Sequence, residues 1–276
     1  MKILICGGGI AGLAAAYWLQ YGGHEVLVAE HTPHLRAAGA QIDLRGQGID
    51  AIDRMGLLDA VRGIRVDGPG VAFVDARGRR WGTVMANTSG KGRQTMTSEY
   101  EIMRGDLVRV LYEATRHHAR FQFGAGVDGF EQDAHRVRAR FCDGTTGAFD
   151  LLIAADGQGS HIRTSLLPPA ENPYRPVGIH LAYWFVPRIA SDSSLRETYC
   201  APGGRVIMRR SHNPSQTQVY FALRENSAEA TAVHRQPIEQ QKTFWSRRYH
   251  DAGWQSDRFI QGMQDADFFY SQEASR

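Results

Sequence analysis

The sequence predicts an α/β fold in which a mainly parallel sheet is interleaved with an antiparallel one. The chain opens on a short apolar run that leads into glycines and then into a helical stretch, which is typical of a strand–helix–strand unit. Between residues 178 and 223, short apolar runs alternate with turn residues and no helical stretch intervenes, which favours antiparallel strands. The 276 residues suffice for one large or two modest domains.

Composition is that of an ordinary globular protein. The residues are 42% hydrophobic and 22% charged, and the formal net charge is +3. The arginines are scattered, so nucleic acid is not expected as a partner. Cys6, Cys142 and Cys200 have neither metal-ligand spacing nor a disulfide framework, which fits a cytoplasmic location and predicts no metal site. No apolar run approaches the length of a membrane span.

The first expected element is a strand over 2–6, followed by a helix over about 10–21. Between them lies the pattern Gly-x-Gly-x-x-Gly at Gly7, Gly9 and Gly12. The first glycine permits a tight turn, the second lets the backbone approach a pyrophosphate, and the third lets the helix pack close to the strand. The helix would then direct its first N–H groups at the phosphates.

A second strand is expected over 25–29, and it ends in Glu30. An acidic residue about 20 positions beyond such glycines holds the ribose hydroxyls of a bound dinucleotide. The glycine pattern is weak evidence alone, but strand, helix, strand and acid occur here together. The sequence therefore predicts a Rossmann-like dinucleotide-binding unit at the start of the chain.

The middle of the chain is expected to alternate short strands with helices. Apolar residues recur at helical spacing after Arg104, so a helix is expected to about His118. The nearly all-apolar run 149–155 favours a parallel strand covered on both faces. The other expected elements are a glycine-rich crossing at 39–46, helices at 47–55 and up to 62, a hairpin at 71–86, an extended segment at 99–103, and strands near 121, 127–132 and 137–141.

A second glycine–acid pair, Asp156 and Gly157, follows the apolar run at 149–155. Open α/β sheets bind ligands at the carboxyl ends of their strands, which is where this pair would lie. Gly157 would allow close backbone approach, and Asp156 could accept hydrogen bonds from sugar or ribityl hydroxyls. The alternative is a plain strand-to-helix turn capped by Ser160.

The last third is expected to begin with a proline-rich crossing at 168–176 and to continue as antiparallel strands. Two helices should follow. The expected strands are 178–186, 197–201, 205–209 and 218–223, and the expected helices are 237–252 and 256–263.

With these motifs in place, the chain resembles class A flavoprotein monooxygenases of the aromatic-hydroxylase type, in particular the tetracycline-inactivating and polyketide hydroxylase branch. The matching pieces are Gly7 to Gly12 with Glu30, the segment 39–46, Arg104 ahead of its helix, and Asp156-Gly157 with Arg163. The resemblance implies an FAD-binding Rossmann-like domain over 1–70 and 101–168, a β-sheet substrate domain over 71–100 and 169–235, and a C-terminal helical segment over 236–276 that is shortened relative to the family.

The resemblance also implies the chemistry. NAD(P)H would reduce FAD, and O2 would then give a C4a-hydroperoxide that hydroxylates an aromatic or polyketide-like small molecule, so no catalytic side chain is singled out. The implied cofactor-binding residues are Gly7, Gly9, Gly12, Glu30, Gln41, Asp43, Arg45, Arg104, Asp156 and Gly157. The implied substrate-binding residues are His180, Tyr183, Phe185, Met208, Arg210 and Phe221.

The chain also departs from the family pattern, because it ends before a third cofactor motif, a Gly-Asp pair. Two alternatives therefore stay open: a redox-inactive relative that acts as a cyclase, isomerase or hydrolase, and a binding or partner protein. The shortening predicts an exposed apolar surface and hence a homodimer or a partner chain at the C-terminal region. The aromatics expected there are Phe244, Trp245, Trp254, Phe268 and Phe269. Alternatively, the two helices after residue 237 bury these aromatics within one chain.

Overall fold

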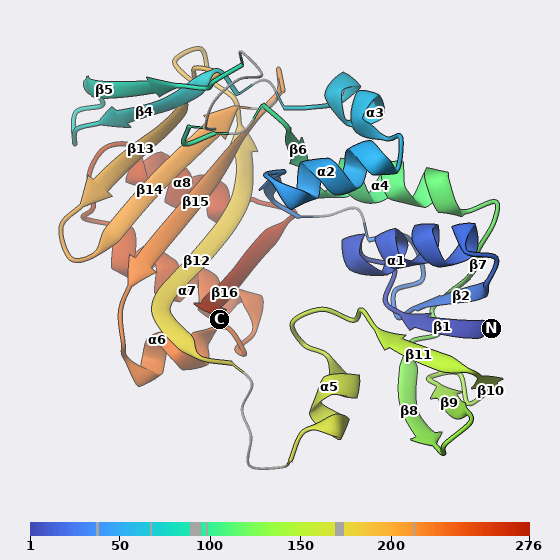
Figure 1. Ribbon diagram of the computed structural model, residues 1–276. Coiled ribbons are helices and arrows are strands. Elements are labelled where there is room, and N and C mark those ends of the chain that lie inside the picture. Colours follow the sequence, from blue (N-terminus) through green and yellow to red (C-terminus); the bar gives the residue numbers. More distant parts are fainter. Residues whose placement is uncertain (37–38, 67, 89–94, 98, 169–173, 212) are drawn as a thin grey trace. The chain divides into compact units, whose positions relative to one another are not determined.

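The computed structural model describes residues 1–276 except 37–38, 67, 89–94, 98, 169–173 and 212. The chain forms two compact units (Figure 1), and each is built from segments that are not contiguous in sequence. The first unit consists of Met1–Ile42, Gly46–Arg65 and Ile102–Glu171, and the second of Asp43–Arg45, Val66–Glu101 and Asn172–Arg276.

A four-stranded sheet of parallel strands is the centre of the first unit, as the opening motif predicts. Its order is β11-β1-β2-β7, formed by Leu151–Ala154, Lys2–Cys6, Glu25–Glu30 and Arg120–Phe123. The expectation that the 149–155 run is covered on both faces holds only in part: Leu152 and Ile153 pack, partly buried, against the clusters on the two faces of the sheet. Strand β11 lies at the edge of this sheet, and Leu151 is 40% exposed. The apolar run therefore marked an edge strand, which an apolar sequence by itself does not distinguish from a central one.

The two faces of this sheet are covered differently, and the alternation along β1 shows how. Ile3 and Ile5 pack with Ala16 of helix α1 (Ile10–Tyr21). Leu4 and Cys6 point to the other face and pack against a small antiparallel sheet. That sheet consists of β8 (Val127–Gln132), β9 (Val137–Phe141) and β10 (Thr146–Phe149).

The remaining elements of the chain up to residue 171 are short. Helix α4 (Arg104–Thr115) packs alongside α1, and β3 (Gln41–Asp43) pairs with β6 (Glu101–Met103). The other helices are α2 (Gln47–Arg54), α3 (Leu58–Gly63) and α5 (His161–Leu166).

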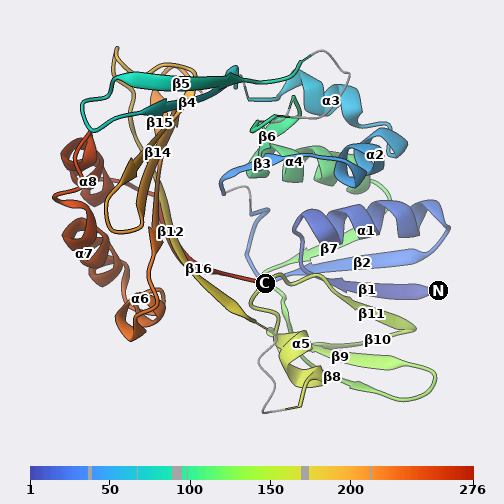
Figure 2. The ribbon, with the colours of Figure 1, turned by 60° about the vertical axis from the view of Figure 1, so that its left-hand side comes forward.

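A seven-stranded sheet forms the second unit (Figure 2), and all its neighbouring strands are antiparallel except β13 and β4. Strand β16 was not anticipated from the sequence. It joins the edge of the sheet beside β12, so the chain after residue 268 is part of the sheet. In sheet order the strands are β16 (Phe269–Ser275), β12 (Pro176–Pro187), β15 (Gln216–Arg224), β14 (Arg205–Ser211), β13 (Arg196–Ala201), β4 (Gly70–Val74) and β5 (Arg80–Met85).

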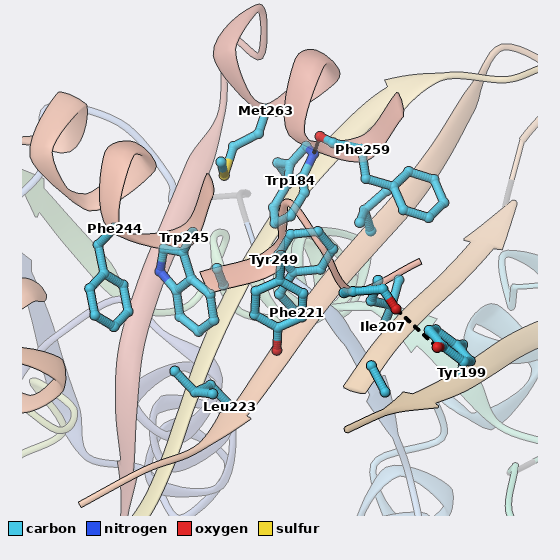
Figure 3. Packing of buried hydrophobic residues seen from close by; sticks show 14 of the residues in the cluster. Trp184, Tyr199, Ile207, Phe221, Leu223, Phe244, Trp245, Tyr249, Phe259 and Met263 are labelled. Carbon is cyan, nitrogen blue, oxygen red and sulfur yellow. Dashed lines mark hydrogen bonds between the residues drawn. The ribbon is translucent and has the colours of Figure 1, made fainter. Parts of the chain in front are cut away.

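Three helices cover one face of this sheet (Figure 2): α6 (Ala228–Val233), α7 (Ile238–Tyr249) and α8 (Ser256–Gln264). Large side chains fill the space between sheet and helices (Figure 3). Phe221 of β15 stacks on Tyr249 of α7 with ring centroids 3.9 Å apart, and Trp184 of β12 donates its indole N–H to the carbonyl of Phe259 at 3.2 Å. The packing thus satisfies the one polar group that the buried indole carries.

The C-terminal aromatics do not form the exposed surface expected for a shortened chain. Phe244 and Trp245 are buried, with 4% and 0% of their surface exposed, and Trp254, Phe268 and Phe269 are partly buried. Burial of a side chain such as Trp245 stabilises the fold by about 2–3 kcal/mol. The alternative expectation holds for Phe244 and Trp245, which the helices after residue 237 bury against the chain's own sheet, with Trp254 and Phe269 partly buried beside them. Phe268 instead packs against Tyr183 and Phe185 on the opposite face, and self-association stays a prediction.

No described helix combines the length and apolar character needed to cross a membrane.

Candidate functional site

A cavity in the first unit lies at the carboxyl ends of β1, β2 and β11, where the sequence placed its two glycine–acid motifs. Such strand ends are where open parallel sheets bind ligands. Side chains from the β8–β9 region complete the wall. The lining residues are Cys6, Gly7, Gly9, Ala29, Glu30, His31, Thr32, Arg36, Arg104, Gly126, Val127, Asp128, Cys142, Ala155, Asp156, Gly157, Gly159 and His161.

The glycine loop is shaped by contacts that exclude a side chain. Gly7 has φ +109°, and a Cβ there would lie 2.4 Å from the carbonyl oxygen of Ala155. A Cβ on Gly12 would lie 1.9 Å from the carbonyl oxygen of Gly7. Gly9 precedes α1 and caps it with no side chain, so the first-turn N–H groups of the helix lack a side-chain acceptor. The turn at Gly7 and the close packing at Gly12 are those that the spacing predicts, while the approach of a phosphate to the backbone at Gly9 stays a prediction.

Glu30 is held rigidly at the end of β2. Its Oε2 accepts from the backbone N–H of Gly8 at 2.7 Å, and its Oε1 accepts from the N–H and hydroxyl of Thr32, each at 2.9 Å. Burial opposes ionisation of this carboxyl, but the hydrogen bonds from Thr32 and Gly8 outweigh it, so the pKa of Glu30 lies below its usual value. An ionised carboxylate with one bond on Oε2 keeps acceptor capacity there for a ligand hydroxyl.

Arg104 begins α4 and lines the same cavity as Asp156. Its Nη1 donates to the carbonyl of Arg36 at 3.1 Å. Gly39 makes room for it, because a Cβ at Gly39 would lie 2.7 Å from Cδ of Arg104. The glycine-rich crossing therefore serves to admit the arginine side chain to the cavity, where it supplies a fixed positive charge.

The loop at Asp156 has features of both predicted alternatives, the ligand-binding turn and the plain strand-to-helix turn. Ser160 caps α5 by accepting from the N–H of Arg163 at 3.0 Å, as the plain turn predicts. Arg163 also donates to the carbonyls of Gly157 and Gln158, which fixes the loop against its helix. Asp156 nevertheless has a purpose that the turn does not explain: its Oδ1 is buried and has no hydrogen-bond partner. A buried acceptor left unpaired is costly, so a ligand that donates a hydrogen bond fits this position.

Four predicted cofactor-binding residues are not among those that line the cavity. Gly12 acts behind it, by close packing. Gln41 opens β3. Asp43 and Arg45 belong to the second unit, where they form an ion pair at 3.1 Å, and Arg45 also donates to the carbonyl of Thr95.

Several lining residues were not among the predicted cofactor-binding residues. His31 and Thr32 directly follow Glu30, so their position was available as a signal. Asp128 comes from β8 and Cys142 from the turn after β9, more than a hundred residues beyond the glycine loop, and no cofactor motif marks them. The polar wall that they add is a product of tertiary packing.

Strand pairing in the second unit divides the six predicted substrate-binding residues between two faces. The register aligns Tyr183 with Tyr220 and Tyr220 with Met208, so all three share a face. Phe185 and Arg210 lie on that same face, which is opposite to the helices. Tyr183, Phe185, Met208 and Arg210 are thus brought together, as expected of residues that share a ligand.

The prediction that His180 and Phe221 face the substrate is not met, because both lie on the helix-covered face with none of their surface exposed. His180 hydrogen bonds to His234 and to the carbonyl of Glu225, each at 2.9 Å, and Phe221 is stacked on Tyr249. Both lie on the same face of the sheet as Trp184, a core residue. The sequence shows that side chains alternate between the two faces but not which face the helices cover.

Charges on the open face of the sheet are partly neutralised. Arg210 forms a buried ion pair with Glu101. Burial raises the pKa of Glu101, and the Arg210 guanidinium opposes that shift without cancelling it. The hydroxyl of Tyr183 has no hydrogen-bond partner, and burial raises the pKa of that phenol. An acceptor brought to this face would satisfy the Tyr183 hydroxyl.

Comparison with known proteins also indicates FAD binding. A family model described as FAD binding domain matches residues 1–254. The FAD-dependent monooxygenase asL4 of Sarocladium schorii is 38% identical over 275 residues, which are 98% of this chain and 64% of the relative. The FAD-dependent monooxygenase asL6 of the same organism is 33% identical, over 98% of this chain and 68% of the relative. The chain therefore spans about two thirds of the length of these relatives.

Among solved structures, the tetracycline destructase Tet(55) superposes with a TM-score of 0.87 at 26% sequence identity, over 99% of this chain and 68% of that one. This likeness confirms the expected fold, a Rossmann-like unit interleaved with an antiparallel sheet.

Proposed function

Because the chain belongs to the FAD binding domain family of class A flavoprotein monooxygenases, we propose that it acts as an FAD-dependent monooxygenase. In this proposal the first unit holds FAD and the second presents the substrate. The observation that carries it is the unpaired Oδ1 of Asp156 in a cavity that also contains the glycine loop and the fixed Glu30 carboxylate.

The residues present fit a flavin dinucleotide. The N–H groups at the start of α1 and the Gly7 and Gly9 backbone would receive the pyrophosphate, since a helix N-terminus carries partial positive charge. Glu30 Oε2 would accept a ribose hydroxyl. When bound, FAD supplies the redox chemistry, taking electrons from NAD(P)H and activating O2.

The polar groups around the cavity would each have one task. Asp156 Oδ1 would accept a hydroxyl of the ribityl chain, and Arg163 would keep the Asp156 loop in place. Arg104 would supply positive charge on the flavin side. Gln41, Asp43 and Arg45 remain proposed cofactor contacts by resemblance alone.

The proposed substrate is an aromatic or polyketide-like small molecule. Tyr183, Phe185 and Met208 offer apolar and aromatic surface on one face of the sheet, beside the hydroxyl of Tyr183 and the guanidinium of Arg210. The likeness to a tetracycline destructase supports this class, because that protein's name refers to a polycyclic aromatic polyketide. We also propose that the reaction takes place in the cytoplasm, as the cysteine usage suggested.

Titration of the purified chain with FAD, followed by flavin fluorescence and absorption, tests the proposal. We expect saturable binding and bleaching of the flavin band by NAD(P)H. Asp156→Ala should weaken FAD about tenfold, since a lost hydrogen bond to a charged group costs about 1.5 kcal/mol. Asp133→Ala, in an exposed turn of the small sheet, is the matched control and should leave the affinity unchanged. A folded wild-type chain that binds no FAD would overturn the proposal.

A further inference from the structure

The second unit contains a separate hollow that plays no part in the proposed reaction. It lies on the helix-covered side of the sheet, between the β4–β5 turn and the segment that joins α7 to α8. Its wall is polar and rich in arginine. Its charged and aromatic lining residues are Arg77, Arg80, Arg209, Glu197 and Trp254.

Positive charge exceeds negative charge in this wall. Glu197 is shared between two guanidiniums: its Oε1 accepts from Nη2 of Arg80 at 2.7 Å, and its Oε2 accepts from Nη2 of Arg209 at 2.5 Å. Asp192 lies behind, but it is itself bonded to Arg258 at 2.6 Å. Three arginines therefore face two carboxylates in this network, which leaves one positive charge.

Arg77 adds a second positive charge at the mouth of the hollow, where its side chain is exposed. The neighbouring Arg79 does not line the hollow, and it is paired with Asp75 at 2.8 Å. The same turn thus carries one arginine that is neutralised locally and one that faces the hollow.

Arg209 is the buried part of this wall, with 1% of its surface exposed. Its Nη groups donate to the carbonyls of Ser193 and Ser191 and to Glu197, and its Nε, which makes no hydrogen bond, forms an ion pair with Oδ1 of Asp192 at 3.6 Å. Arg209 therefore contributes buried positive charge to the wall, which favours an oxyanion in the hollow.

Trp254 forms the apolar side of the hollow in a backbone conformation unusual for a residue with a side chain. Its φ is +53°, and among the described non-glycine residues it alone has a positive φ. Its N–H donates to the carbonyl of Ala76 at 3.0 Å, and its ring packs against Tyr199 and Phe259. Surrounding contacts hold this strained residue in place, as is common where the conformation serves a site.

We propose that this hollow binds the phosphate group of a small molecule. Guanidinium groups match phosphate oxygens in geometry as well as charge, and the net positive charge of the wall favours a doubly charged oxyanion. The Trp254 ring offers a flat apolar surface to whatever part of the molecule carries the phosphate. The site requires nothing of the cavity in the first unit and does not depend on the proposed monooxygenase activity.

Calorimetric titration of the full chain with inorganic phosphate, at constant ionic strength set by chloride, tests the site. We expect saturable binding that Arg77→Ala weakens about tenfold, the effect of one lost charge-assisted contact. Arg79→Ala is the matched control and should bind as the wild type does, because that arginine faces Asp75. Both side chains are exposed, so both variants should fold, which circular dichroism checks.

A parallel titration with NADP⁺ and NAD⁺ distinguishes the sources of the phosphate. Tighter binding of NADP⁺ that depends on Arg77 identifies a nucleotide phosphate, and equal binding with Arg77-dependent inorganic phosphate identifies a free one; both support the site. Absence of saturable phosphate binding by the wild type overturns the proposal. Equal affinity of the Arg77→Ala and Arg79→Ala variants does so too, since phosphate would then be bound elsewhere.

Discussion

The two units hold their polar groups in different ways. In the first unit, backbone groups position the key side chain: Glu30 is fixed by the N–H groups of Thr32, two positions away, and of Gly8, 22 positions away. In the second, side chains far apart in sequence fix one another, as when Arg80 bonds to Glu197 across 117 positions. The first arrangement leaves Glu30 with acceptor capacity for a ligand, whereas in the second the two charged partners neutralise each other.

A chain of hydrogen bonds in the second unit also joins side chains that are far apart in sequence. His180 Nε2 bonds to the carbonyl of Glu225 at 2.9 Å, so this nitrogen must carry the proton. With neutral rings, His180 Nδ1 then accepts from His234 Nε2 at 2.9 Å, and His234 Nδ1 accepts from the Ser271 hydroxyl at 2.7 Å. Trp245 donates to Ser271 at 2.9 Å and completes the chain.

The comparison therefore predicts that substitutions in the second unit act on stability, and that substitutions around the first unit's cavity act on binding. Phe221→Ala is expected to have the largest effect on stability. It removes a ring stacked on Tyr249 in the core, so we expect a loss of about 3–5 kcal/mol in the free energy of unfolding, measured by urea denaturation. Phe185→Ala on the opposite face should cost less. Equal losses would contradict the assignment of the two faces.

Gly12→Ala probes the backbone packing of the first unit. A Cβ placed 1.9 Å from the Gly7 carbonyl oxygen forces α1 away from the glycine loop, so we expect a loss of about 3 kcal/mol. Gly63→Ala is the control, because a Cβ there meets no atom within 4 Å, and it should change stability by less than about 0.5 kcal/mol. If Gly12→Ala unfolds at the wild-type denaturant concentration, the close approach is not required.

Glu30→Ala tests whether the first unit's carboxylate serves a ligand rather than the fold. We expect FAD affinity, measured by fluorescence titration, to fall by about 1–3 kcal/mol, since a partly buried charged acceptor is lost. Glu25→Ala, at the exposed start of the same strand, should leave the affinity unchanged. An unchanged affinity in the Glu30 variant would remove the ribose assignment while leaving the fold assignment intact.

The histidine chain predicts a smaller, pH-dependent effect. Burial, followed by the neighbouring His180, lowers the pKa of His234 from 6.5 to about 4. The unfolded chain therefore binds more protons between these values, and stability is lost as pH falls from 6.5 toward 4. Because His234 is only partly buried, we expect solvent screening to limit the loss to about 1 kcal/mol.

The measurement is the difference in unfolding free energy between pH 7 and pH 5 for the wild type and for His234→Gln, which cannot titrate. The wild type should lose more stability than the variant over this interval. Identical pH dependence in the two proteins would show that His234 contributes no proton linkage.

The sequence determined the α/β fold and much of the candidate site. Gly7, Gly9, Glu30 and Asp156 could be placed at the cavity because short turns at strand ends impose local requirements: a positive φ at Gly7, and an acid at the end of a strand or two residues beyond it. Such requirements act within a few residues, so the order of residue types records them.

Tertiary structure alone decided the rest. The sequence-based prediction put His180 and Tyr183 on the same substrate-facing side, although their spacing places them on opposite faces of a strand, and the docking of α6, α7 and α8 made the face of His180 the core. Likewise, β11 became an edge strand and β16 joined the second sheet through pairings with strands distant in sequence. Burial depends on which surfaces meet when the chain folds, and partners separated by many residues leave no local pattern by which they can be recognised.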